Sequence, residues 1–122
     1  MHYLWIFLGG GLGSMARFAL SQYLPPAQGW PWGTLAANLA ACFLLGLLGA
    51  YFEQKGGPMA YKLLLATGFC GGFSTFSTFG QELFQLLRAQ AHAMALGYLL
   101  ASVILGILAM ALGYYSLANR GF

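Results

Sequence analysis

Four long apolar stretches fill most of this 122-residue chain and leave room for little else. A helix that crosses a bilayer needs about 20 mostly apolar residues. The stretches cover about residues 3–24, 33–52, 62–87 and 93–117, and prolines and short polar segments separate them. Proline lacks the N–H that a helix interior requires. The sequence therefore predicts an all-α membrane protein, with residues 1–122 forming a single domain of four transmembrane helices.

Charged side chains are too rare for a soluble protein. Only 6% of the residues are charged, whereas ordinary globular proteins have roughly 25%. The five basic residues do not form the cluster that phosphate binding requires: they are Arg17, Lys55, Lys62, Arg88 and Arg120. This composition excludes a cytosolic enzyme, a disordered tail and a nucleic-acid-binding protein.

The basic residues also give little orientation signal. Lysine and arginine near span ends favour the cytoplasmic side. A cytoplasmic N-terminus would place Lys55, Lys62 and Arg120 inside, and Arg17 and Arg88 outside. This near-balance predicts a chain that can insert in either direction. The alternative is that so small a protein has too few charges for the count to decide.

A narrow face of small and polar residues runs along the second stretch, from Thr34 through Asn38 and Cys42 to Gly46 and Gly49. The Asn38 amide offers two N–H donors that suit an anion. The alternative is an interhelical hydrogen bond, which asparagine often makes in bilayers. The chain's two cysteines both lie in apolar stretches, and we interpret them as buried free thiols.

The third stretch contains glycines and hydroxyl groups in its middle, over residues 66–79. The pair Gly71-Gly72 should weaken the helix, because each glycine costs about 1 kcal/mol relative to alanine. Non-helical backbone at this depth is tolerated only where it is covered by protein or lines a wet cavity. We therefore expect a broken third helix at Gly71-Gly72, with carbonyl groups free to hold a cation.

After this break, Phe76 and Phe79 are three residues apart and share one helix face. Thr75, Thr78 and Glu82 share the neighbouring face. Aromatic rings are negative on their faces and positive at their edges. Ring edges next to hydroxyl and amide donors would suit a small anion. The alternative for both phenylalanines is packing or lipid contact.

In the fourth stretch, Tyr98 and Ser102 are one helical turn apart, and Gly106 continues the same line. These residues could extend a polar track. Alternatively, Tyr98 lies at the membrane interface and the Ser102 hydroxyl bonds back to its own helix.

The first stretch is rich in glycine and contains one embedded cation. Gly9 and Gly13 are four residues apart in an apolar segment, which indicates close helix packing. A dinucleotide-binding loop is excluded, because no strand precedes these glycines. Arg17 either extends to the lipid head groups or forms a positive mouth that attracts anions.

Three segments together resemble the Fluc (CrcB) family of fluoride ion channels. They are residues 68–79 (GFCGGFSTFSTF), 10–18 (GGLGSMARF) and 33–38 (GTLAAN). The resemblance extends over the whole chain. It implies an antiparallel, dual-topology homodimer with a broken third helix, two fluoride pores and a structural sodium ion at the dimer interface.

The same resemblance implies roles for individual residues. The fluoride pore would be lined by Asn38, Phe76, Ser77, Thr78, Phe79, Tyr98 and Ser102. Arg17 and Glu82 would lie in the vestibule, and main-chain carbonyls of Gly71 and Ser74 would bind sodium. Gly106 and Met110 occupy positions where some members carry hydroxyl groups, so the far end of the track differs here.

The expected function is passive fluoride export across the inner (plasma) membrane, in a cell that we expect to be bacterial. Coupling to protons is not expected, because both histidines, His2 and His92, lie at span ends. One alternative is a small multidrug-resistance-type cation exporter, but that class needs a carboxylate in its first helix. Another is a structural membrane subunit without transport, which would not explain the Ser/Thr/Phe pattern.

Overall fold

The computed structural model describes residues 1–25 and 29–118, so Pro26 and Arg120 lie outside the described ranges. The helices in chain order are α1 (His2–Tyr23), α2 (Trp32–Lys55), α3 (Met59–Tyr61), η1 (Lys62–Cys70), α4 (Gly71–Phe73), α5 (Phe76–Arg88) and α6 (His92–Ala118). Within these described ranges, four segments are long and apolar enough to cross a membrane: α1, α2, Met59–Arg88 and α6. The prediction of an all-helical, multi-pass membrane protein is therefore confirmed.

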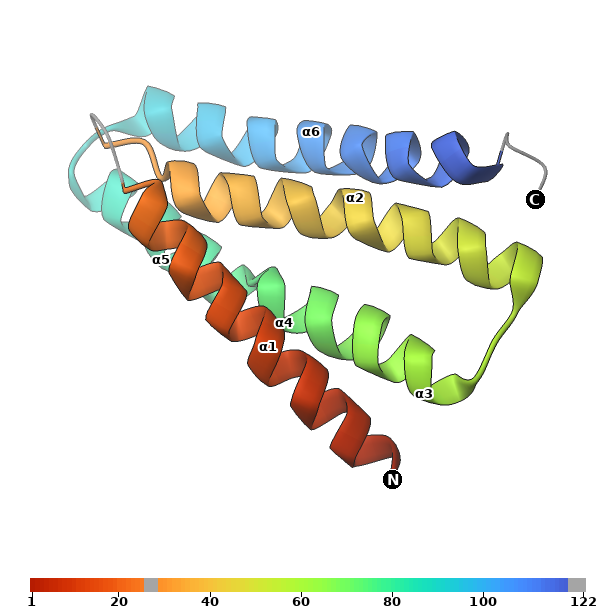
Figure 1. The fold of residues 1–122 in the computed structure, drawn as a ribbon. Helices are drawn as coiled ribbons and strands as arrows, with labels where there is room; N and C mark the ends of the chain where they lie inside the picture. The colour runs from red at the N-terminus through yellow and green to blue at the C-terminus, as the bar shows by residue number, and fades with distance from the viewer. Residues whose placement is uncertain (26–28, 119–122) are drawn as a thin grey trace.

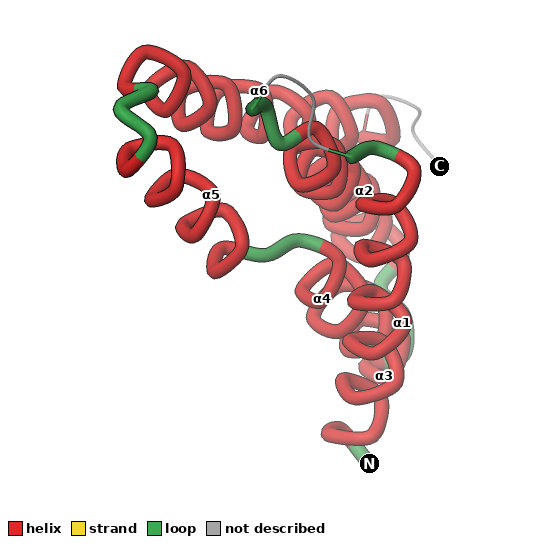
Figure 2. Tube along the Cα trace, turned by 90° about the vertical axis from the view of Figure 1, so that its left-hand side faces the viewer, coloured by secondary structure: helices red, strands yellow, loops and turns green. Residues whose placement is uncertain are grey.

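The four spans form two packed pairs (Figure 1). The helices α2 and α6 lie side by side and run in the same direction, and α1 lies along η1 and α4. The third span changes direction after α4, so that α5 leaves this second pair and reaches α6 (Figure 2). This course brings residues of α2, α5 and α6 together at one end of the protein.

Glycines permit the close approach of the helices within each pair. A Cβ atom at Gly9 or Gly13 of α1 would collide with a backbone carbonyl oxygen of η1. A Cβ at Gly46 of α2 or at Gly113 of α6 would likewise collide with a carbonyl oxygen of the facing helix. The expectation of close helix packing at Gly9 and Gly13 is confirmed.

The third span departs from helical geometry at a different place from the one predicted. Gly71 and Gly72 are helical, whereas Ser74 and Thr75 are extended, with φ/ψ of −90°/154° and −152°/130°. The prediction of a break at Gly71-Gly72 is therefore wrong. Helix propensity is a weak constraint that tertiary packing overrides, and Gly72 is required for packing because a Cβ there would collide with Gly10.

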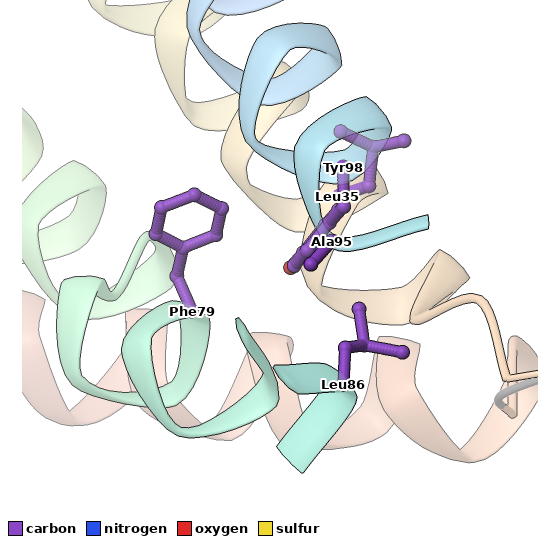
Figure 3. Close-up of a cluster of buried hydrophobic side chains, with 5 residues drawn as sticks. All are labelled: Leu35, Phe79, Leu86, Ala95 and Tyr98. Atoms are coloured by element: carbon purple, nitrogen blue, oxygen red, sulfur yellow. The ribbon is translucent and has the colours of Figure 1, made fainter. Parts of the chain in front are cut away.

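A small apolar cluster joins the three helices that meet at this end (Figure 3). Leu35 comes from α2, Phe79 and Leu86 come from α5, and Ala95 and Tyr98 come from α6. Many large apolar side chains elsewhere on α1 and α6 are exposed. Such exposure fits a helix surface that lies in lipid, where it needs no protein cover.

Candidate ion pathway

The Glu82 carboxylate accepts hydrogen bonds from two hydroxyl groups on different helices. The Tyr98 hydroxyl donates to Oε1 at 2.9 Å, and the Thr34 hydroxyl donates to Oε2 at 2.9 Å. Tyr98 is 0% exposed, so its side chain is covered by the protein itself. These bonds tie α5 to α2 and α6 and place a polar cluster beside the apolar core.

Asn38 holds the extended segment of the third span. Its Oδ1 accepts a hydrogen bond from the Thr75 backbone N–H at 3.1 Å. This bond sets the orientation of the amide, because only the oxygen can accept. The Nδ2 group then has no hydrogen-bond partner within residues 1–25 and 29–118. One amide therefore makes the interhelical contact and still offers two N–H donors.

The Thr75 side chain begins α5 as its N-cap. Its hydroxyl accepts from the Thr78 backbone N–H at 3.5 Å and lies 3.0 Å from the Ser77 hydroxyl. A threonine N-cap satisfies one of the free N–H groups at a helix start. The three hydroxyl-bearing residues thus lie at or next to the first turn of α5.

The Asn38 amide and the two predicted pore phenylalanines line one hollow of about 550 Å³, which we call the phenylalanine hollow. Its lining residues are Asn38, Cys42, Gly71, Ser74, Thr75, Phe76, Ser77, Phe79, Ser102 and Val103. Phe79 is 8% exposed and packs on Tyr98 at 5.0 Å between ring centroids. Phe76 is 82% exposed, and its ring lies 6.0 Å from that of Phe79.

Ser102 contributes a hydroxyl group that makes no hydrogen bond among the described residues. Its Oγ is buried and has no hydrogen-bond partner in the part of the chain that the structure describes. The alternative that this hydroxyl bonds back to its own helix is therefore wrong. An unpartnered buried hydroxyl costs about 1–3 kcal/mol, and Ser102 is one of the residues that line the phenylalanine hollow.

Arg17 and Glu82 line a separate, smaller hollow of about 180 Å³. Thr34 and Thr78 line the same hollow. The Nε of Arg17 donates to the carbonyl oxygen of Gly72 at 3.2 Å. The two predicted vestibule residues thus line the same hollow, in which Glu82 is the carboxylate that accepts from Thr34 and Tyr98.

The two residues predicted to bind sodium through their carbonyl groups, Gly71 and Ser74, also line the phenylalanine hollow. In a continuous helix the Thr75 N–H would donate to the carbonyl of Gly71, four residues earlier. Here it donates to Asn38 instead. The Gly71 carbonyl therefore loses its usual helical partner at the edge of this hollow.

Two residues with clear roles here were not predicted as site residues. Helix periodicity predicts Thr34 on the polar face of the second span, but it cannot show the bond to Glu82, which joins residues 48 positions apart. Thr75 was grouped with Thr78 and Glu82 on one face. Threonine is a preferred N-cap residue, but Ser74, Ser77 and Thr78 also carry hydroxyl groups, so the sequence does not single out Thr75 as the helix start.

Comparison with known proteins places the chain in a family. Residues 4–114 match the family model described as CrcB-like protein, Camphor Resistance (CrcB). A protein of Ignicoccus hospitalis named fluoride-specific ion channel FluC is 42% identical over 90% of this chain and 89% of its own length. Proteins with the same name from Phocaeicola vulgatus and Pyrococcus abyssi are 41% and 42% identical, over 92% and 96% of this chain and 94% and 95% of their own lengths. The chain therefore belongs to the CrcB family.

Proposed function

We propose that this protein is a fluoride-selective channel through which fluoride leaves the cell passively across the plasma membrane. Its relatives over most of the chain are named fluoride-specific ion channels. The cation exporter is not favoured, because the chain's two carboxylates, Glu53 and Glu82, lie outside the first helix. The relatives include archaeal proteins, so the proposal covers a prokaryotic plasma membrane rather than a bacterial one.

The observation that carries this proposal is the chemistry of the phenylalanine hollow. Asn38 lines it with an amide whose N–H donors are unpartnered among the described residues, and Ser102 lines it with a buried, unpartnered hydroxyl. The rings of Phe76 and Phe79 lie beside these donors. Donors and positive ring edges can replace the water around a small anion. Among residues 1–25 and 29–118, no charged side chain lines this hollow.

Permeation then proceeds by exchange of ligands rather than by a chemical reaction. Fluoride would pass from the vestibule of Arg17 and Glu82, along Thr78 and Ser77, to the donors of Asn38 and Ser102. The Tyr98 hydroxyl, predicted to line the pore, already donates to Glu82 and would hold that carboxylate in place. The membrane potential supplies the driving force, because each anion that leaves a negative interior gains about 2.3 kcal/mol per 100 mV.

We further propose that the working unit is an antiparallel homodimer. The phenylalanine hollow is open on the single chain, and the 82% exposure of Phe76 leaves a large ring without cover from its own chain. A second copy on this face would close the hollow and cover that ring. Dual insertion fits the near-balance of basic residues at the span ends.

A structural sodium ion at the dimer interface belongs to the same proposal. The donor set fits a hard cation: Gly71 and Ser74 offer main-chain oxygens at a break, and the Gly71 carbonyl has lost the Thr75 N–H that a helix would supply. A bound sodium ion would compensate these carbonyls, each of which costs several kcal/mol when unsatisfied in an apolar core. The ion would hold the break and would not travel with fluoride.

Efflux from liposomes tests the function directly. Purified protein is reconstituted with internal potassium fluoride, and a fluoride electrode records release when valinomycin clamps the voltage. A channel releases fluoride according to voltage, without a pH or sodium gradient. A chloride-loaded control measures selectivity. Fluoride release that equals that of protein-free liposomes would refute the proposal and favour a structural subunit, whereas export of organic cations would favour the exporter.

Orientation is tested separately, with lysines added to one loop. Added lysines should force one orientation and reduce fluoride efflux. Co-expression of two versions biased in opposite directions should restore it. Full efflux from a single biased version would refute antiparallel assembly while leaving the channel function intact.

A further inference from the structure

The phenylalanine hollow adjoins a second, larger hollow between α2 and α6. This α2–α6 hollow has a volume of about 690 Å³ and extends from Ser102 to Tyr115 along α6. Three residues line both hollows: Cys42, Ser102 and Val103. These residues therefore form the junction through which one hollow leads into the other.

The junction contains two groups that can donate hydrogen bonds. The Ser102 Oγ is buried and has no partner among the described residues. The second group is the Cys42 thiol, which is half-buried and free. A thiol is a weak donor, and Val103 offers none. An anion that crosses the junction can thus meet one hydroxyl and one thiol.

The shape of α6 keeps the thiol uncovered. Gly106 follows Ser102 by one helical turn, and a Cβ there would lie 3.6 Å from the Cys42 Sγ. The absence of that side chain leaves the sulfur facing the α2–α6 hollow. Beyond the junction, the glycines and Met110 that line this hollow offer no side-chain donor until Tyr114. An anion in this stretch of the hollow therefore depends on the side-chain donors at the junction.

We propose that the Cys42 thiol, together with the Ser102 hydroxyl, contacts the permeating anion at this junction, and that Cys42 is a covalent modification site at which a small thiol reagent closes the pathway. This inference rests on the proposed function, because it requires fluoride to use both hollows. It assigns to α2 a donor at the level where α6 carries Gly106.

The chain contains its own control for this inference. Its other cysteine, Cys70, is 3% exposed and lines neither the phenylalanine hollow nor the α2–α6 hollow. The variants Cys70→Ala and Cys42→Ala therefore each retain one thiol. The first thiol lies at the junction, and the second lies outside it, buried beside a hollow of about 240 Å³ that Cys70 shares with Cys42. Both variants replace a thiol by a methyl group, so the chemical change is matched.

The test applies methyl methanethiosulfonate to proteoliposomes of both variants. The Cys42 thiolate attacks the sulfenyl sulfur of the reagent, a new S–S bond attaches a methylthio group, and methanesulfinate leaves with the bonding electrons. The thiol proton passes to the buffer. Mass spectrometry counts the adducts, and a fluoride electrode measures efflux from the same sample.

We expect Cys70→Ala to gain one adduct and to lose fluoride efflux by about tenfold or more, because the methylthio group fills the junction and replaces its thiol donor. Cys42→Ala should keep its own efflux rate after treatment. Without reagent, Cys42→Ala should conduct about fivefold more slowly than the parent, as expected for one lost hydrogen bond. Cys42→Ser should recover flux relative to Cys42→Ala because its hydroxyl donates.

Two results would overturn the inference. Modified Cys42 with unchanged efflux would place the thiol outside the pathway, and a Cys42 that gains no adduct would show that the junction is closed to small molecules. Size-exclusion chromatography of the treated protein must show an unchanged profile for the efflux loss to count as support. A parent protein that passes no fluoride would instead refute the proposed function itself.

Discussion

Substitution of Asn38 by aspartate separates the two roles that the structure gives this side chain. The Asn38 Oδ1 accepts from the Thr75 N–H at 3.1 Å, and its Nδ2 has no partner in residues 1–25 and 29–118. Aspartate can still accept from Thr75, so the extended segment should keep its anchor. What Asn38→Asp removes is the pair of N–H donors, and it adds a negative charge.

The size of the effect follows from these two changes. A hydrogen bond to a charged partner contributes about 1.5–3 kcal/mol. Repulsion between a carboxylate and a fluoride ion about 4 Å away adds about 4 kcal/mol at an effective dielectric constant of about 20. Together these terms raise the barrier by at least about 5 kcal/mol, which slows permeation by about a thousandfold or more. Asn38→Asp should therefore show no efflux above that of empty liposomes.

Asn38→Ala is the informative comparison. Alanine removes both the acceptor and the donors, but it adds no charge, and it releases the Thr75 N–H, which can itself donate to an anion. We expect reduced but measurable fluoride efflux from Asn38→Ala. Both variants are compared at pH 7, where the aspartate of Asn38→Asp is ordinarily ionised. Size-exclusion profiles should match for both variants. If Asn38→Asp conducts as well as Asn38→Ala, the amide is an anchor and not an anion ligand.

Three further predictions test the pore, the packing and the ion. Phe76→Ile and Phe79→Ile should both reduce fluoride efflux strongly. Phe79→Ile should also lower thermal stability in detergent, since Phe79 packs on Tyr98 at 5.0 Å. Parent-like efflux from both would show that the rings only pack. Gly13→Ala should destabilise the protein by about 1–3 kcal/mol through overpacking, because its Cβ would lie 2.8 Å from the Phe73 backbone nitrogen. Gly11→Ala is the control, because a Cβ there meets nothing within 4 Å. Equal melting temperatures of these two variants would contradict this. Fluoride efflux should not respond to a sodium gradient but should fall after prolonged sodium removal, and a reversal potential that follows the sodium gradient would indicate cotransport.

The fold class could be predicted from the sequence because apolar length is a local property. Each span has enough apolar residues to cross a bilayer, and each packed pair has glycines at the positions of closest approach. The location of the extended segment could not be predicted in the same way. Gly72 stays helical and packs against Gly10. Ser74 and Thr75 leave the helix because Asn38, which is 37 positions from Thr75 in the sequence, binds the Thr75 N–H.

The site was predictable in its residue types but not in its connections. Asn38, the phenylalanines and the hydroxyl groups could be selected because polar side chains are rare in these spans. Their pairing depends on helix–helix geometry, which one sequence does not contain. The bonds from Thr34 and Tyr98 to Glu82 and the closeness of Cys42 to Gly106 became apparent only from the fold.

The start of α5 within the third span also shapes the electric field of the hollow. A helix of 13 residues that begins at Phe76 carries a partial positive charge of about half a unit at its first turn, from N–H groups without intrahelical partners. The Thr75 hydroxyl satisfies the N–H of Thr78, and the aligned peptide dipoles remain. A buried lysine or arginine would hold an anion with a full charge and slow its departure. A macrodipole attracts the same ion more weakly, so it can favour anions over cations and still release each one, as conduction requires.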